Sequence, residues 1–162
     1  ENGNFIRNYY TEEDHPESGN IYKMVIGRTT KICSVSSMIK KSILEKLGYY
    51  DENLDYEDLD LWIRTSREYE FEYIPEILVK KRVLSHSLSS HFLIEKNSRA
   101  KKLNASTLQI LIKAFQLNRT KDEHKALIRR IRFEMYKFIK ARNFNLLLQL
   151  FLLEIKVRLK SI

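Results

Sequence analysis

Residues 47–64 read LGYYDENLDYEDLDLWIR, and the prediction of the fold starts from this stretch. Gly48 follows a run of helical periodicity over residues 40–47, which predicts that a helix ends there. Asp55 is a favourable N-cap residue, and apolar residues at helical spacing after it predict a second helix over residues 55–69. We therefore expect two helices joined by a turn-rich loop.

Three carboxylates, Glu57, Asp58 and Asp60, lie in the opening turns of this second helix. A helix N-terminus favours an ionised carboxylate, and such a group at the edge of a cleft can take a proton from a hydroxyl. Asp60 and Arg64 are four residues apart, so they can pair along the helix and orient the acidic turn. Acidic residues in a first turn also stabilise a helix without any chemistry, and the spacing alone leaves both interpretations open.

The order of these residues resembles the acceptor half of family-2 glycosyltransferases, inverting enzymes of the GT-A fold that use nucleotide sugars. The family's motif is a small apolar–Gly–aromatic–Asp-Glu stretch, then Glu-Asp, then Asp-Leu-Trp-x-Arg. The matching residues are Gly48, Tyr50, Asp51, Glu52, Glu57, Asp58, Asp60, Leu61, Trp62 and Arg64. Residues 36–42 are similar to the strand and turn that precede this motif in the family, and residues 73–79 with Arg82 resemble the strand pair that follows it.

The resemblance implies that Asp58 is the catalytic base. It would deprotonate an acceptor hydroxyl, which then attacks the anomeric carbon of the donor in one inverting displacement. Glu57 would shape or bind the acceptor, and Asp60 belongs with the binding residues. Trp62 either packs in the core or forms a platform for a sugar, and Arg64 either orients the acidic turn or faces the donor phosphates.

Two further candidates come after the last expected strand. Family members often carry Arg-x-His there, in a loop over the donor diphosphate, whereas this chain has Arg82-Val83-Leu84 followed by Ser85-His86. The resemblance implies donor binding for Arg82. His86 is a candidate for a phosphate or metal role from a shifted position, and a solvated loop histidine is the alternative.

The donor half of the family, with the Asp-x-Asp motif that holds Mg²⁺ or Mn²⁺, has no counterpart before Ser36. The resemblance therefore implies that this chain is the C-terminal part of a truncated catalytic domain. We expect no cofactor in this part, and Mg²⁺ or Mn²⁺ in the intact enzyme.

The expected fold class is α+β and mainly α. Predicted strands at residues 32–36, 71–74 and 77–84 would form a C-terminal remnant of the GT-A sheet, followed by a helical tail. We expect residues 1–91 to be the acceptor-side part of the catalytic domain and residues 92–162 to be a basic α-helical region.

Charge separates the two regions. Residues 1–95 carry 12 basic and 17 acidic side chains, whereas residues 96–162 carry 17 basic and four acidic ones. In the tail, Arg129, Arg130 and Arg132 interleave with apolar residues. This pattern is typical of a bundle helix with a solvated basic face, of a helix at an anionic membrane surface, or of a nucleic-acid interface. No nucleic-acid motif accompanies it, so we expect no nucleic-acid partner.

Residues 144–155 are apolar nearly all round, so they must pack in a bundle, against a second copy in a homodimer, or at a membrane interface. No run of 18 apolar residues is present. One cysteine, Cys33, excludes an internal disulfide and fits a reducing compartment.

The expected function is transfer of a sugar from a nucleotide-sugar donor to a glycan or lipid-linked acceptor, in bacterial polysaccharide biosynthesis for the cell envelope. The expected location is the cytoplasm, either free or at the inner face of the cell membrane. The alternative is a basic helical module without enzymatic activity that binds a membrane surface or a polyanion.

Overall fold

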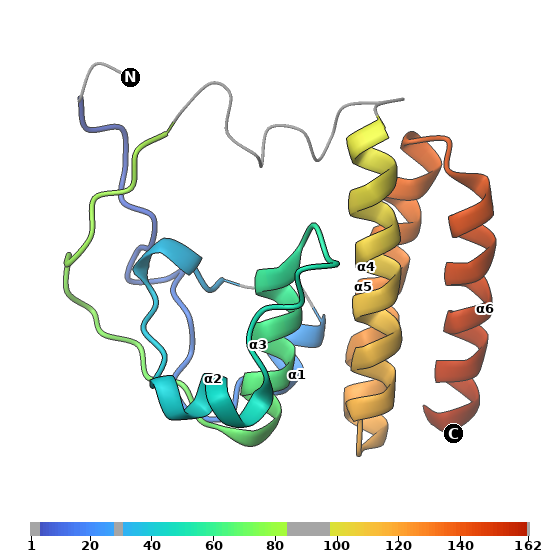
Figure 1. Ribbon diagram of the computed structural model, residues 1–162, viewed down its shortest axis with the longest axis horizontal. Helices are drawn as coiled ribbons and strands as arrows, with labels where there is room; N and C mark the ends of the chain where they lie inside the picture. Colours follow the sequence, from blue (N-terminus) through green and yellow to red (C-terminus); the bar gives the residue numbers. More distant parts are fainter. Residues whose placement is uncertain (1–3, 28–30, 84–97, 162) are drawn as a thin grey trace.

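The structure is a computed structural model that describes residues 4–27, 31–83 and 98–161 (Figure 1). Helices account for all of its regular secondary structure within these ranges. In chain order they are α1 (Tyr22–Gly27), a 3-10 turn η1 (Ser34–Ser36), α2 (Lys41–Leu47), α3 (Glu57–Glu68), α4 (Ser98–Leu117), α5 (Lys121–Lys140) and α6 (Phe144–Ser161).

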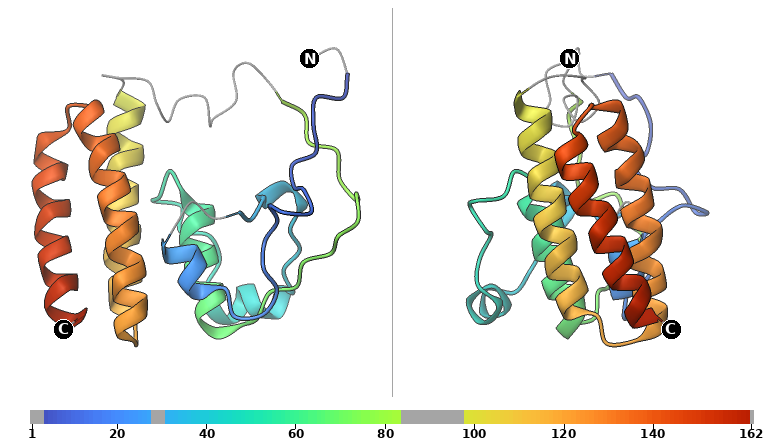
Figure 2. Two further views of the ribbon diagram at one scale, coloured as in Figure 1. Left: turned by 180° about the vertical axis from the view of Figure 1, so that it is seen from behind. Right: turned by 90° about the vertical axis from the view of Figure 1, so that its right-hand side faces the viewer.

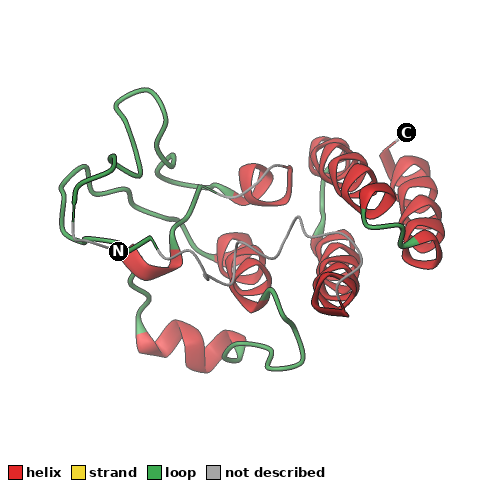
Figure 3. Ribbon diagram, turned by 90° about the horizontal axis from the view of Figure 1, so that it is seen from above, coloured by secondary structure: helices red, strands yellow, loops and turns green. Residues whose placement is uncertain are grey.

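The described residues contain no β-strand, so the expected α+β fold with a sheet remnant is wrong and this part of the chain is all-helical (Figure 3). Residues 32–36 include the 3-10 turn, and residues 77–83 are exposed and irregular. Phe71 makes only an isolated antiparallel bridge, in which its backbone exchanges hydrogen bonds of 2.7 and 2.9 Å with Gly19. A β-rich segment becomes a strand only when another strand pairs with its backbone, and these segments have no such neighbour within the described ranges.

The helices form layers. The long helices α4, α5 and α6 stand side by side as a bundle, and α6 is its outermost member (Figure 1, Figure 2). On the opposite side of the bundle, α1 packs against α5 and α3 packs against α4. Helix α2 lies farther from the bundle, whereas the loop between α2 and α3 reaches α4. This arrangement fixes the start of α3 beside the middle of α4.

One hydrophobic core holds these layers together. Its buried side chains include Ile26 from α1, Trp62 from α3, Leu111 from α4, Leu127 from α5 and Leu150 from α6. Residues 1–91 and 92–162 therefore contribute to the same buried cluster. Burial of this apolar surface, at about 25 cal/mol per Å², is the main favourable term that joins α3 to the bundle.

The predicted helix ends are partly confirmed. Gly48 follows α2 with a φ of 75°, a left-handed value that favours glycine. Thr120 caps α5 in a capping box with Glu123, three residues farther along the sequence. The prediction that Asp55 caps α3 is wrong, because Tyr56 occupies the N-cap position and makes no side-chain cap bond.

Candidate active site at the start of α3

The loop before α3 is rigidly held, and it sets the position of the acidic turn. The Asp51 carboxylate accepts a hydrogen bond of 3.1 Å from the backbone N–H of Asn53, which closes a local turn. Leu54 is buried and anchors the loop in the core. The backbone N–H of Asp55 donates to Ser106 Oγ of α4 at 2.9 Å. Glu57 is the first residue of α3, so this well-anchored loop fixes the position of the first turn of the helix.

The three carboxylates of this turn have different surroundings. Glu57 is exposed and Asp58 is half-buried, whereas the Asp60 residue is 1% exposed. Asp58 Oδ2 accepts a hydrogen bond of 2.7 Å from Ser34 Oγ, and Oδ1 accepts one of 2.7 Å from the N–H of Leu59. The Asp58 carboxylate is therefore held in one orientation and remains accessible at the N-terminus of α3.

Asp60 is the buried centre of an ion-pair network. Its carboxylate lies 2.8 Å from Arg64 Nε and 3.1 Å from Lys113 Nζ of α4. The spacing of Asp60 and Arg64 predicts this helix pair, but Lys113 is far away in the sequence and was missed. With two cationic partners and almost no exposure, Asp60 supports the turn and faces away from solvent.

Arg64 also binds the end of α2. Its guanidinium donates to the carbonyl oxygens of Leu47 at 2.7 Å, Gly48 at 2.9 Å and Tyr49 at 2.9 Å. These carbonyls lie at the C-terminal end of α2 and just after it, where a cation is favourable because the helix dipole is negative there. Two roles were considered for Arg64, and this geometry favours the one in which it orients the acidic turn.

Lys113 joins the Asp60 network to the loop. Its ammonium lies 2.7 Å from Asp51 Oδ2 and 3.1 Å from Asp60 Oδ1. The bond to Lys113 and the bonds from Asn53 lower the pKa of Asp51 to about 2. Burial alone lowers the pKa of Lys113, but its bonds to Asp51 and Asp60 outweigh that effect and the net pKa is raised. Asp51 and Lys113 are therefore both charged at neutral pH.

The remaining predicted residues lie apart from this turn or outside the described residues. Trp62 is 1% exposed and packs edge-on against Phe71 with ring centroids 6.1 Å apart, so its ring is part of the core. Arg82 is exposed in the irregular segment 77–83. His86 lies outside the described residues.

Sequence reasoning missed a second group of side chains near Asp58. Tyr10 Oη donates to the carbonyl of Lys31 at 2.6 Å and accepts from the N–H of Cys33 at 3.0 Å, and burial raises its pKa to about 12. Lys81 Nζ lies 4.8 Å from the Tyr9 ring centroid. Burial raises the pKa of Tyr9, with smaller contributions from Cys33 and a still smaller one from the Asp58 charge. The aromatic rings and a cation thus lie on the Ser34 side of Asp58, and no periodic pattern in the sequence points to them.

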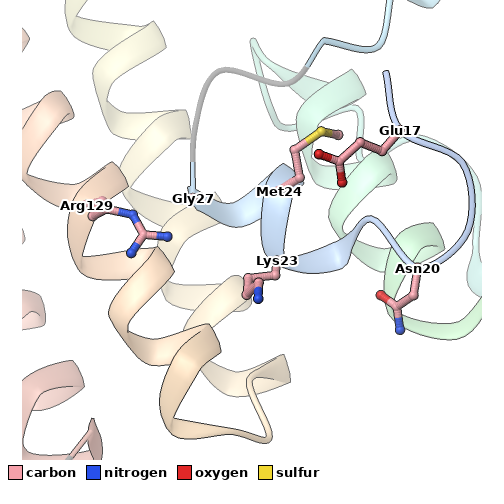
Figure 4. Close-up of a pocket in the computed structure, with 6 residues that line it drawn as sticks. All are labelled: Glu17, Asn20, Lys23, Met24, Gly27 and Arg129. Atoms are coloured by element: carbon pink, nitrogen blue, oxygen red, sulfur yellow. The ribbon is translucent and has the colours of Figure 1, made fainter. Parts of the chain in front are cut away.

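A concave pocket lies elsewhere on the molecule. It has a volume of about 190 Å³ and lies between α1 and α5 (Figure 4). Its lining residues are Glu17, Asn20, Lys23, Met24, Gly27 and Arg129. The acidic turn does not contribute to this pocket. Comparison with protein-family models, with curated proteins and with solved structures found no match.

Proposed function

We propose that the chain is the acceptor-side part of a family-2 glycosyltransferase, in which Asp58 is the general base toward an acceptor hydroxyl. The observation that carries this proposal is the difference among the three carboxylates. Asp60 is buried in ion pairs, and Glu57 is exposed to solvent. Asp58 combines partial exposure with a fixed orientation, because Ser34 and the N–H of Leu59 each bind one of its oxygens. A general base requires that combination of access and fixed geometry.

The reaction follows from this role. The ionised Asp58 carboxylate takes the proton of a sugar hydroxyl of a glycan or lipid-linked acceptor. The acceptor oxygen forms a bond to the anomeric carbon of a nucleotide sugar, and the bond to the diphosphate breaks, with its electron pair leaving on phosphate oxygen. Attack opposite the leaving group inverts the configuration. Ser34 keeps one Asp58 oxygen oriented, and Glu57 at the rim binds or shapes the acceptor.

The resemblance assigns a divalent cation, Mg²⁺ or Mn²⁺, to the donor half. The described residues of this chain hold no group of three or more His, Cys, Asp and Glu side chains that could bind a metal ion. They do not fit such an ion, so no step of the proposed reaction is assigned to a metal here. Arg82 remains the proposed contact to the donor phosphates.

The test uses the intact enzyme, because a base without a donor site lacks the positioning that lowers the barrier. A panel of nucleotide sugars is offered with candidate acceptors, and release of nucleoside diphosphate is followed. For Asp58→Asn we expect kcat to fall by about 10²–10⁴-fold, with KM for the donor little changed. Glu57→Gln removes the neighbouring charge and is the matched control, for which we expect a smaller loss.

Near-normal turnover by Asp58→Asn would contradict the proposal. If Glu57→Gln alone abolished turnover, the base would be Glu57 and the assignment within the turn would be wrong. The 162-residue chain alone should not transfer sugar from any member of the panel, and measurable transfer by it would show that the donor site is not elsewhere.

A further inference from the structure

The outer face of α6 is an apolar stripe without a partner among the described residues. Its members are exposed by 40–69% although all are large and apolar: Phe144, Leu148, Phe151, Leu152, Ile155 and Leu159. Their spacing of four, three, one, three and four residues puts them on one side of the helix. The buried residues Leu150, Leu153 and Val157 lie on the other side and pack into the bundle. We call the exposed set the outer stripe of α6.

The position of α6 leaves this stripe open. The helix is the outermost member of the bundle, on the side opposite α1 and α3 (Figure 1, Figure 2). A contiguous apolar face of this kind marks an interaction surface, because monomeric proteins rarely expose one. In the described part of the chain, no helix is both long and apolar enough to cross a membrane.

Cations border the stripe on both sides. Lys156 and Lys160 are exposed on one side of it, and Arg158 is on the other. Arg158 also borders an open groove of about 450 Å³ between α5 and α6. The groove is lined by Lys125, Ile128, Arg129, Arg132, Arg158 and Ser161.

Acidic groups neutralise this border only in part. Glu154 pairs with both Arg132, at 3.0 Å, and Arg158, at 2.6 Å, and Asp122 pairs with Lys125 at 3.3 Å. Arg130 does not belong to the basic surface, although its position beside Arg129 suggests so. Its guanidinium is buried 2.7 Å from Glu134.

The outer stripe could bind a second copy of the chain or a lipid surface, and charge distinguishes these two partners. A second copy would bring two strongly basic surfaces together, since residues 96–162 carry 17 basic and only four acidic side chains. An anionic lipid surface is complementary to the same charges, and an interfacial helix combines an apolar face with flanking Lys and Arg.

We propose that the outer stripe of α6 binds the surface of an anionic membrane, with its apolar side chains at the acyl boundary and the bordering cations at the lipid phosphates. This surface is separate from Asp58 and its role does not depend on the proposed chemistry. Arg158, Lys156 and Lys160 supply the electrostatic part of the binding, which salt screens. Burial of the stripe supplies the apolar part, which salt leaves unchanged.

The test is co-sedimentation of the 162-residue chain with vesicles of phosphatidylcholine and of phosphatidylcholine mixed with phosphatidylglycerol. We expect binding to the anionic vesicles that weakens at high salt. The variant Leu148→Gln/Phe151→Gln/Ile155→Gln should bind at least about tenfold more weakly. The control Ile77→Gln/Leu78→Gln changes two exposed apolar residues away from α6 and should bind like the parent.

A charge variant keeps the proposal testable if the stripe variant unfolds. Lys156→Gln/Lys160→Gln alters only exposed side chains and should weaken binding to anionic vesicles by about 30-fold, or about fivefold for each lysine. Three outcomes would overturn the proposal. They are no binding of the parent to anionic vesicles, equal binding by the folded stripe variant, and a parent dimer that the stripe variant converts to a monomer.

Discussion

Replacement of Asp60 tests whether the acidic turn is held by its ion pairs. Asp60→Ala removes bonds of 2.8 Å to Arg64 and 3.1 Å to Lys113 from a residue that is 1% exposed. A hydrogen bond to a charged group contributes about 1.5–3 kcal/mol, so the two bonds set an upper limit of about 3–6 kcal/mol. The Arg64 and Lys113 side chains are 20% and 37% exposed and keep their other partners, so water and those partners recover part of the loss. We expect a loss of about 2–4 kcal/mol in the free energy of unfolding.

Urea and thermal unfolding measure this loss directly. The chain has one tryptophan, Trp62, which is buried two residues from Asp60, so its fluorescence reports unfolding at the site. The expected loss corresponds to a decrease in Tm of about 4–16 °C for a chain of this size. Glu57→Ala is the matched control in the same turn, and as an exposed substitution it should change stability by no more than about 0.5 kcal/mol. Equal stability of the two variants would refute the assignment of Asp60 as a structural residue.

Two further predictions concern other groups. Thr120→Ala removes the side-chain acceptor of the α5 capping box and should lower the free energy of unfolding by about 0.5–2 kcal/mol, as measured by urea unfolding. The pKa of Asp51 is depressed to about 2, so its contribution to stability is complete above its unfolded-state pKa of about 4 and disappears as the pH falls toward 2. Lys113→Met removes the main cause of that depression, so its urea midpoint should decrease less steeply than that of the parent over the same acid range.

The helices are predictable because their signals are local. Thr120 and Glu123 are three residues apart, so the capping box is visible in the sequence and marks the start of α5 within one residue. Gly48 likewise ends α2 where the periodicity stops. The end of the tail is less well predicted, since apolar residues on both sides of α6 obscure which side faces the core.

The strand predictions are wrong because strand formation depends on residues that are distant in the sequence. Residues 77–79 are Ile, Leu and Val, which favour extended backbone, yet they are exposed by 80, 64 and 47%. β-propensity measures how well a side chain fits a half-buried sheet surface, and so it has no effect without neighbouring strands. Within the described ranges, β-type backbone pairing occurs as the isolated bridge between Gly19 and Phe71. These residues are 52 positions apart in the sequence, so no local pattern predicts their pairing.

The candidate site likewise contains contacts that the sequence predicts and contacts that it does not. The Asp60–Arg64 pair follows from a spacing of four residues on a helix, and the structure has it at 2.8 Å. The bond from Ser34 to Asp58 joins residues 24 positions apart and could not be read from any pattern. The resemblance predicts a role for Asp58 from motif order alone, whereas burial and hydrogen bonding distinguish the three carboxylates by their surroundings.

The acidic residues 1–95 and the basic residues 96–162 suggest two parts with separate roles, but α4 of the basic part contacts the acidic turn and the loop before it. Ser106 of α4 accepts the backbone hydrogen bond of Asp55, and Lys113 of the same helix pairs with Asp51 and Asp60. Without α4 these two carboxylates would lose a cationic partner. The turn that carries Asp58 is therefore anchored by α4, whereas the Asp58 carboxylate itself is oriented by Ser34 and the N–H of Leu59. The basic region supports the acidic site because its lysine supplies the positive charge that the buried Asp60 carboxylate requires.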